Sequence, residues 1–280
     1  MLGQDLVAEL QSRHEVIPLK RGDADITDAP RITGAIERSR PDVVVHCAAF
    51  TAVDDCESQA SLAFQVNCEG TRNVAAACRN AGAGMVYLST DYVFDGKKPS
   101  PYIETDEPNP INVYGRSKLE GERRVNDVMG NTQRAWIVRV SWLFGPLGKN
   151  FVRTILERAR RGEPLRVVDD QVGAPTYTAD AAAKIRLIVE KGAPGTYHVT
   201  NQGYCSWFGF AREILRQAAE LVKMEPVPLT PMTSQELRRP ARRPRNSRLE
   251  NARLRSEELG FLPSWEDAVS RYLRRAIAAR

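Results

Sequence analysis

Residues 42–49, DVVVHCAA, decide the fold class of this chain. The run is short, continuous and rich in valine, which is typical of a strand that is buried on both faces of a sheet. Comparable apolar runs are EVIPL (15–19), GMVYLST (84–90) and AWIVRVSWLFG (135–145). Amphipathic stretches between these runs predict helices at about 28–39, 57–80 and 115–129. Strands and helices in alternation predict an α/β fold with a doubly wound parallel sheet that carries helices on both faces.

The second half of the chain continues this pattern and then leaves it. Two weaker strands are predicted at 165–170 and 195–201, each after a helical segment, at 149–161 and 178–191. Beyond Tyr204 a helix at 206–222 leads into the proline-interrupted stretch 224–232, an arginine-rich segment and a final helix near 265–279. We therefore expect a smaller, mostly helical lobe beside the sheet.

The composition is that of an ordinary globular protein, with 280 residues, 42% hydrophobic and 27% charged. The formal net charge is +5, but the excess is local, because residues 238–255 hold eight arginines against one acidic residue, Glu250. A uniform nucleic-acid-binding surface is therefore not implied. The arginine run is either a solvated face or a basic edge for a phosphorylated ligand.

Cysteine usage and hydropathy indicate the compartment. The five cysteines form no CxxC pair, which favours reduced thiols in the cytosol. No run approaches the roughly 18 apolar residues that a membrane helix needs, and no secretory signal is visible. We expect a cytoplasmic protein without a membrane-bound segment.

The strongest chemical signal is YGRSK, Tyr114 to Lys118. Residues four apart on a helix share a face, so the phenol and the ammonium point into the same space. A nearby cation lowers the pKa of a phenol from its usual value near 10, which would make Tyr114 a usable proton donor.

Polar and small side chains follow the predicted strands where active sites collect, at the carboxyl edge of the sheet. The strand 84–90 ends with Ser89 and Thr90, and Asp91 comes next. Ala48 and Ala49 follow the strand at 42–46, where small side chains let a flat ligand approach the backbone. His46 is interpreted as a strand-end histidine without a catalytic role.

These pieces, in this order, resemble the extended short-chain dehydrogenase/reductase family and, within it, the dTDP-4-dehydrorhamnose reductases. The resemblance covers essentially the whole chain. It rests on the strings DADITD (23–28), CAAFTAVDDCES (47–58), VNCEGTRNVA (66–75), STDYVFDG (89–96), YGRSKLEGE (114–122), VRVSWLFG (138–145), GKNF (148–151), DDQVGAPT (169–176) and RRPRNSRL (242–249).

The resemblance implies a Rossmann-type dinucleotide-binding part and a substrate-binding lobe. We expect the first part to span 1–145 with 177–201, and the lobe to span 146–176 and 202–280. The reaction it implies is reduction of the C4 ketone of dTDP-4-dehydro-β-L-rhamnose by a nicotinamide cofactor. In that reaction Tyr114 protonates the ketone oxygen, Lys118 tunes Tyr114 and holds the nicotinamide ribose, and Thr90 hydrogen-bonds the developing alkoxide.

Further positions carry over from the family motifs. Residues expected at the cofactor are Gly3, Lys20, Arg21, Asp25, Ile26, Ala48, Ala49, Asn67, Tyr114 and Lys118. Residues expected at the nucleotide-sugar are Asp91, Tyr92, Trp142, Asn150, Gln171, Thr176, Arg239 and Arg243. Asp25 and Ile26 match an adenine-contacting pair, and Trp142 matches a residue that closes over the sugar. Either Arg239 or Arg243 would hold the pyrophosphate, where a planar guanidinium fork matches phosphate oxygens.

The residues at the end of the strand expected at 15–19, which corresponds to the second strand of the family, indicate which cofactor is used. NAD enzymes commonly place an acid there to bind the ribose 2′-hydroxyl, whereas a cation accommodates a 2′-phosphate. Here the sequence reads PLKRGD, with Lys20 and Arg21 at that place. We expect NADPH, with NADH as the alternative.

Two other interpretations stay open. The chain could be another nucleotide-sugar reductase or epimerase with the same Tyr and Lys, or a regulatory subunit like the β subunit of methionine adenosyltransferase. Thr90, Tyr114 and Lys118 together argue against a pure binding subunit. The scattered glutamates Glu157, Glu163, Glu190 and Glu257 are read as surface charges, so no metal is predicted; a monomer or a homodimer is expected.

The opening MLGQDLVAEL reads as the inside of a helix. In the family a strand and a turn of the form GxxGxxG come first, and Met1 to Gly3 match only the end of that turn. We expect that the first strand is missing from this sequence, either because Met1 is an internal methionine and the natural chain carries about ten more residues, or because this copy is truncated and inactive or regulatory. Without that strand, weak folding and weak cofactor binding are expected.

Overall fold

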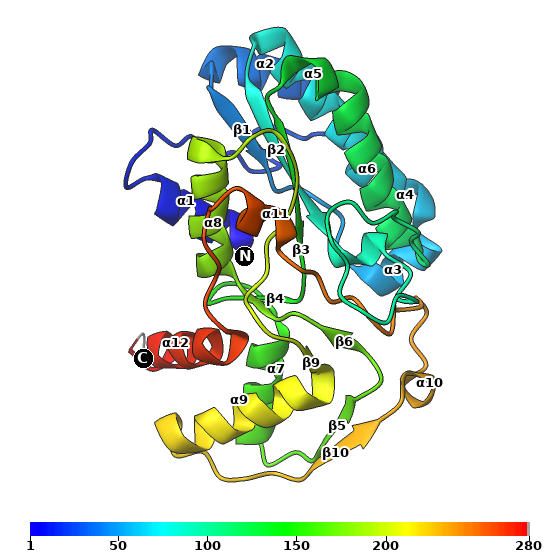
Figure 1. Ribbon diagram of the computed structural model, residues 1–280, viewed down its shortest axis with the longest axis vertical. Helices are drawn as coiled ribbons and strands as arrows, with labels where there is room; N and C mark the ends of the chain where they lie inside the picture. The colour runs from blue at the N-terminus through cyan, green and yellow to red at the C-terminus, as the bar shows by residue number, and fades with distance from the viewer. Residues whose placement is uncertain (279–280) are drawn as a thin grey trace.

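A four-stranded parallel sheet organises the upper half of the molecule in the computed structural model, which describes residues 1–278 (Figure 1). Its strand order is β1 (Val43–His46), β2 (Gly84–Thr90), β3 (Ala135–Val140) and β8 (Gly195–His198). All three strand pairs are parallel. The predicted α/β class with a parallel Rossmann-type sheet is confirmed.

Helices cover both faces of this sheet, as Figure 1 shows. They are α1 (Leu2–Leu10) and α8 (Thr178–Lys191) on one face, and α2 (Ala29–Ser39), α5 (Thr71–Ala81) and α6 (Val113–Met129) on the other. Alternation along the strands explains this arrangement. Val86 and Val138 pack into the core under α1 and α8, whereas Met85 and Ile137 pack under the other three helices.

The lower half in Figure 1 is built from helices and short strand pairs around a second core. The helices are α7 (Phe151–Arg160), α9 (Trp207–Val222), α10 (Ser234–Leu237) and α12 (Trp265–Ala278). The short helix α11 (Ala252–Ser256) lies instead beside β8 of the main sheet. The strand pairs are β4 (Leu143–Phe144) with β7 (Thr176–Tyr177), β5 (Leu165–Val168) with β10 (Leu229–Met232), and β6 (Val172–Gly173) with β9 (Cys205–Ser206). Phe144 and Phe210 lie at the centre of this core.

Strand β10 was not predicted, because prolines interrupt its stretch of sequence. It pairs in parallel with β5, and Pro231 lies opposite Val167. A proline cannot donate to a strand ladder, but β10 has a single neighbour, so its other edge tolerates the missing donor.

The strand expected at 15–19 does not form, and this prediction is wrong. Ile17 and Leu19 are 52% and 46% exposed. A strand needs a hydrogen-bonded partner, and no described segment pairs with this run. Strand β1, whose valines are half-buried, forms the edge of the described sheet.

The single helix expected at 57–80 is instead a series of helical segments. They are α3 (Val53–Ser58), α4 (Ala60–Phe64), the π-helical turn η1 (Gln65–Gly70) and α5. Two further short turns are the 3₁₀ segments η2 (Asp91–Val93) and η3 (Gly130–Thr132). A π-helical turn inserts a residue into a helix and commonly accompanies a functional site. Here the turn carries Asn67, which is fully buried.

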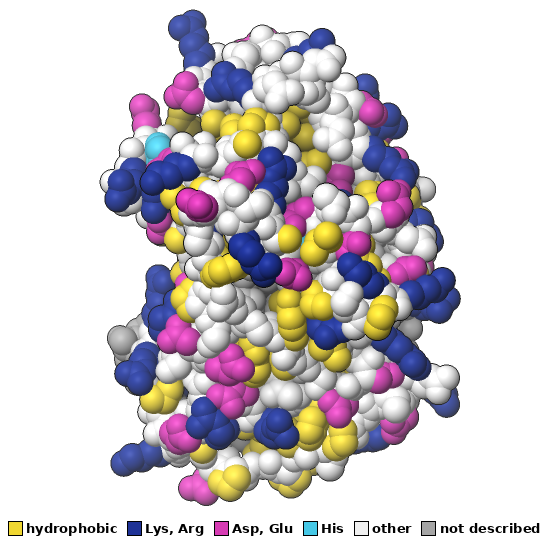
Figure 2. Space-filling view, viewed as in Figure 1, with side chains coloured by type: hydrophobic (Ala, Val, Ile, Leu, Met, Phe, Trp, Pro, Cys, Tyr) yellow, Lys and Arg dark blue, Asp and Glu magenta, His cyan; other side chains and the backbone are white. Residues whose placement is uncertain are grey.

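The surface is mixed in charge. On the face shown in Figure 2, Lys and Arg side chains alternate with Asp and Glu side chains. Several arginines of the run 238–255 are paired, including Arg253 with Glu257 at 2.7 Å and Arg255 with Glu250 at 2.8 Å. Within residues 1–278, no helix is long and apolar enough to span a bilayer.

Candidate active site

The site lies where β2 ends and α6 begins. Thr90 is the last residue of β2, and Tyr114 is the second residue of α6. The side chain of Asn112 caps α6 by accepting the amide hydrogen of Gly115 at 2.7 Å. A Cβ at Gly115 would overlap the carbonyl oxygen of Tyr92, so only glycine lets the first turn of α6 lie this close to the residues after β2.

Thr90 and Tyr114 are hydrogen-bonded through their hydroxyl groups. Burial raises the pKa of the Tyr114 phenol, and the bond with Thr90 opposes that shift. We expected Lys118 to lower this pKa, and that expectation is wrong for the structure, because the ammonium of Lys118 lies over the ring of Tyr87, 4.1 Å from its centroid. Tyr114 therefore keeps its proton at neutral pH, as a proton donor must.

Lys118 lies one turn further along α6 and is 3% exposed. Burial lowers the pKa of its ammonium to about 7, while the Glu122 carboxylate and Cys47 oppose that shift. Among residues 1–278, none accepts a hydrogen bond from this ammonium. Its donors are therefore available to a ligand at the end of β1 and β2.

Asp91 is buried beside Thr90, and protein hydroxyls occupy its carboxylate. Thr90 Oγ1 donates to Asp91 Oδ1 at 3.0 Å, and Ser141 Oγ donates to Asp91 Oδ2 at 2.9 Å. Ser247 adds a third hydroxyl contact. With 3% of its surface exposed, Asp91 is placed to orient Thr90 through this hydrogen bond.

Burial raises the pKa of the Asp91 carboxyl from 3.8 to about 6, although the three hydroxyls oppose the shift. A carboxyl with a raised pKa in the fold contributes stability at low pH and loses it as pH rises through the folded pKa. As pH rises from about 4 to about 7, the free energy of unfolding of the wild type should fall by on the order of 3 kcal/mol relative to that of Asp91→Asn. Urea unfolding of both proteins across this range measures the difference; parallel stability curves would contradict it.

Asn67 connects the loop after β1 to the catalytic helix. Its Oδ1 accepts the amide hydrogen of Phe50 at 2.8 Å, and its Nδ2 donates to the Phe50 carbonyl at 3.0 Å and to Ser117 Oγ at 2.9 Å. Ser117 adjoins Lys118, so Asn67 fixes this part of α6 relative to the loop. The expected support of the helix has a structural basis, and all the polar atoms of the side chain are used by the protein.

The expected cofactor residues after β1 line an open surface. Ala48 is exposed, Ala49 is half-buried, and Gly3 lies beside them in the first turn of α1. A Cβ at Gly3 would lie 3.5 Å from Cys47 Cβ, so the start of α1 and the end of β1 are neighbours. These small residues leave the backbone accessible to a flat ligand.

The other expected cofactor residues lie on the loop before α2. The Asp25 carboxylate accepts the Thr27 amide hydrogen at 2.9 Å and pairs with Arg21 at 3.0 Å. These bonds lower the pKa of Asp25 to about 2. Ile26 packs against Gly70, and Lys20 is exposed. Lys20 and Arg21 are therefore exposed side chains of the loop before α2.

The two candidate phosphate-binding arginines differ in what they contact. Arg243 binds Asp54 with both terminal nitrogens, at 2.9 and 3.1 Å, and also bonds Tyr92. Arg239 approaches Asp54 with one nitrogen at 3.4 Å, and its side chain is 56% exposed. The guanidinium of Arg243 is thus already hydrogen-bonded within the protein, whereas most of the guanidinium hydrogens of Arg239 face solvent.

Trp142 lies between the two halves of the molecule. Its ring stacks on Trp207 of α9, with centroids 3.5 Å apart and an angle of 8°. The backbone of Trp142 has a φ of 43°, a strained value for a bulky residue. A Cβ at Gly173 would overlap the Trp142 ring, so this glycine makes room for the stack.

Three expected substrate residues are occupied by protein contacts. Asn150 caps α7, accepting the Arg153 amide hydrogen at 3.0 Å and donating to the Gly145 carbonyl at 2.8 Å. Gln171 donates to Ser234 at 2.7 Å, and the fully buried Thr176 donates to the Ala174 carbonyl at 3.1 Å. In this structure these contacts support the loops on which the three residues lie.

Sequence reasoning missed two acidic residues of the region. Asp54 forms an ion pair with Arg243 of the arginine-rich segment. Glu122 of α6 forms an ion pair with Arg139 of β3. Helical spacing could have found Glu122, which is four residues beyond Lys118 and eight beyond Tyr114. Asp54 carried no such signal, because Arg243 is distant in sequence.

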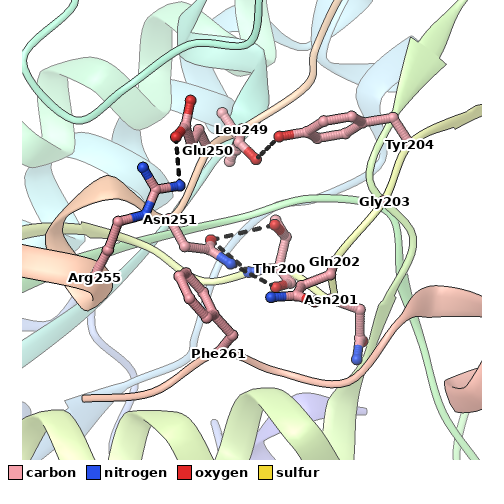
Figure 3. A pocket seen from close by; sticks show the side chains of 10 residues that line it. All are labelled: Thr200, Asn201, Gln202, Gly203, Tyr204, Leu249, Glu250, Asn251, Arg255 and Phe261. Carbon is pink, nitrogen blue, oxygen red and sulfur yellow. Dashed lines mark hydrogen bonds and ion pairs between the residues drawn. The ribbon is translucent and has the colours of Figure 1, made fainter. Parts of the chain in front are cut away.

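A small hollow lies away from Tyr114, between residues 200–204 and 249–251 (Figure 3). Its volume is about 100 Å³. Arg255 and Glu250 on its wall pair with each other at 2.8 Å, and none of the predicted site residues lines it. We therefore do not assign the active site there.

The glutamates considered for a metal are paired with arginines. Glu157 pairs with Arg153, and Glu190 pairs with Arg186, each at 2.7 Å. In the described part of the chain, no three His, Cys, Asp or Glu side chains are grouped so that they could hold a metal ion.

Comparison with known proteins gives one consistent family. The family described as "RmlD substrate binding domain" matches residues 1–277. A dTDP-4-dehydrorhamnose reductase of Streptomyces griseus is 42% identical over 276 residues, covering 96% of this chain and 89% of the relative. A dTDP-4-keto-6-deoxy-D-glucose reductase of Streptomyces niveus is 42% identical over 240 residues, covering 85% and 83%.

A solved structure agrees with these relatives. The crystal structure of dTDP-4-dehydrorhamnose reductase from Bacillus anthracis, in complex with NADP, has a TM-score of 0.92 and 38% identity, covering 98% of this chain and 95% of that one. The resemblance indicated by the sequence motifs is confirmed. The chain belongs to the RmlD substrate-binding-domain family.

Proposed function

We propose that this protein reduces the C4 ketone of dTDP-4-dehydro-β-L-rhamnose with NADPH, giving dTDP-L-rhamnose. The observation that carries the proposal is the hydroxyl pair of Thr90 and Tyr114 at the carboxyl end of β2, with the unbonded ammonium of Lys118 one turn away. The relatives that are named as reductases of dTDP-linked keto sugars support the same reaction.

The residues present fit a dinucleotide. Lys118 is 97% buried by its neighbours yet gives its ammonium hydrogens to no described residue, which suits a ribose with two hydroxyl acceptors. Ala48 leaves the end of β1 open, and Lys20 is exposed at the rim for a 2′-phosphate. When bound, NADPH supplies the hydride.

Tyr114 supplies the proton. Its phenol is neutral at physiological pH because burial raises its pKa, so it can donate to the ketone oxygen as negative charge develops there. Thr90 Oγ1 bonds both the Asp91 carboxylate and the Tyr114 hydroxyl. We infer that Thr90 orients the phenol, and that the phenol turns from Thr90 to the substrate oxygen.

Arg239 is the better candidate for the pyrophosphate. Most of its guanidinium faces solvent, while Arg243 is held by Asp54 and Tyr92. A guanidinium binds phosphate oxygens with charge-assisted hydrogen bonds. Arg243 then keeps the arginine segment against the loop after β1, and Trp142 provides a flat wall for the sugar.

We further propose a dinucleotide-binding part of 1–145 with 177–201 and a substrate lobe of 146–176 and 202–280. The substrate is a nucleotide-sugar. We propose no nucleic-acid partner, in keeping with the mixture of positive and negative side chains on the face shown in Figure 2. We place the protein in the cytoplasm, where NADPH is available, as a monomer or homodimer.

A turnover assay tests this function. The purified chain is mixed with NADPH and dTDP-4-dehydrorhamnose, and the loss of NADPH absorbance is followed. We expect steady oxidation that requires both the sugar and the protein. Tight NADPH binding without any oxidation would instead indicate a regulatory subunit, and oxidation only with other nucleotide-linked keto sugars would indicate a different reductase.

A further inference from the structure

Helix α6 carries three chemically active side chains in one stripe, each four residues from the next: Tyr114, Lys118 and Glu122. This spacing puts them on the helix face that packs against the sheet. Glu122 is 4% exposed, so its carboxylate is held in the protein interior. The mechanism above uses the first two side chains and leaves Glu122 without a role.

Partners from two strands hold the Glu122 carboxylate. Arg139 of β3 donates from Nε to Oε1 at 2.9 Å and from Nη2 to Oε2 at 2.7 Å. Ser89 of β2 donates to Oε1. Such a two-pronged arginine contact fixes both the charge and the orientation of a carboxylate. Glu122 is thus an oriented, buried negative charge.

The groups that face Lys118 from other elements carry no charge at neutral pH. Burial and Lys118 itself lower the pKa of His46, on β1, to about 3. Burial raises the pKa of the Tyr87 phenol on β2, and the pKa of the Cys47 thiol, which follows β1, is also raised, so both groups keep their protons. On α6, the Tyr114 phenol is likewise neutral.

Glu122, which is paired with the guanidinium of Arg139, is therefore the carboxylate of the described residues that acts on Lys118. Arg139 compensates the charge of the carboxylate, and its guanidinium lies 5.2 Å from the ring centroid of Phe94. Its Nη1 has no hydrogen-bond partner within the described chain, so the contact with Glu122 is its main polar attachment.

We propose that Glu122 is a positioning residue that keeps Lys118 in its charged form, and that Arg139 and Ser89 hold Glu122 in place for this purpose. The proposal rests on the role assigned above to Lys118 in holding the cofactor. A charged lysine binds ribose hydroxyls as a donor with three hydrogens, whereas the neutral amine is a weaker donor.

Glu122→Gln tests the proposal through a pH profile. Activity that requires a charged Lys118 falls as pH rises through its pKa, and removal of a nearby negative charge lowers that pKa. The falling limb of kcat/KM should therefore move to lower pH by about one unit, a loss of about tenfold on that limb. At lower pH the variant should approach the wild type.

Two further variants control for structural effects. Glu120→Gln removes a carboxylate from the same helix. Glu120 is paired with Arg123 and is more exposed than Glu122, so the falling limb of the kcat/KM profile of this variant should coincide with that of the wild type. Glu122→Gln combined with Arg139→Met removes both buried charges and leaves no unpaired guanidinium. The falling limb of kcat/KM for this double variant should still move to lower pH, because Arg139 does not act on Lys118 directly.

A readout without cofactor completes the test. In protein carrying lysines labelled at the ε carbon, the Lys118 signal is assigned by its loss in Lys118→Met. Its titration in the cofactor-free protein should move to lower pH in Glu122→Gln. An unmoved titration, with kcat reduced equally at all pH values, would overturn the proposal and leave Glu122 a structural residue.

The same variants separate this proposal from the proposed function. Full reductase activity in Lys118→Met would overturn the role assigned to Lys118, and with it the proposed site. An inactive Lys118→Met together with an unshifted Glu122→Gln would overturn only the role of Glu122.

Discussion

Replacing Tyr114 by phenylalanine is expected to lower kcat roughly 10²- to 10⁴-fold, the range of general acid catalysis by a positioned side chain. The ring is kept, so its edge contact with Tyr92, at 6.0 Å between centroids, remains. Only the hydroxyl that bonds Thr90 is lost. KM for both substrates should change little, because that hydroxyl acts mainly in the transition state.

Steady-state kinetics of NADPH oxidation measure the effect of this variant. Tyr204→Phe is the matched control, since it removes a hydroxyl that bonds the Leu249 carbonyl at 3.2 Å, away from the site. Its kcat should equal that of the wild type. If Tyr114→Phe kept wild-type kcat, another group would have to supply the proton, and the catalytic assignment would be wrong.

The second large effect is expected at Gly121, in the middle of α6. A Cβ there would overlap the hydroxyl of Tyr87 and lie 2.5 Å from the Asn67 carbonyl oxygen. Tyr87 and Asn67 are both fully buried and cannot move aside easily. Gly121→Ala should therefore cost about 1–3 kcal/mol of unfolding free energy, as overpacking does, and should shift Lys118 away from its place.

Urea unfolding and kcat/KM of the same preparation measure both consequences. Gly130→Ala is the control, because Gly130 has helical backbone angles at the end of α6 and a Cβ there meets nothing within 4 Å. This control should be neutral or stabilised by about 0.4–1 kcal/mol. Equal stability of Gly121→Ala and Gly130→Ala would contradict the close packing of α6 on β2.

Much of the fold could be predicted from sequence, because buried parallel strands have continuous apolar runs. Strand β2 was predicted with its observed ends at 84–90, and α8 with its observed ends at 178–191. The segment 15–19 has the same composition but no partner strand in the described sheet. A single run of sequence carries no information about whether its hydrogen-bonding partner is present.

The candidate site was predictable to the same extent. Helical spacing places Tyr114 and Lys118 on one face, and Thr90 follows from the end of an apolar strand. Contacts between distant segments were not readable, so the bond of Gln171 to Ser234 was not predicted. The choice between Arg239 and Arg243 depended on Asp54, which lies far from both in sequence.

The most direct test of the central claim follows the hydride. The protein is incubated with dTDP-4-dehydrorhamnose and NADPH that carries deuterium at the transferable position, and the product is analysed by NMR and mass spectrometry. We expect dTDP-L-rhamnose with one deuterium at C4, formed at least about a hundredfold more slowly with Tyr114→Phe at the same protein concentration. Product without deuterium at C4, or NADPH consumed with the sugar unchanged, would contradict the account.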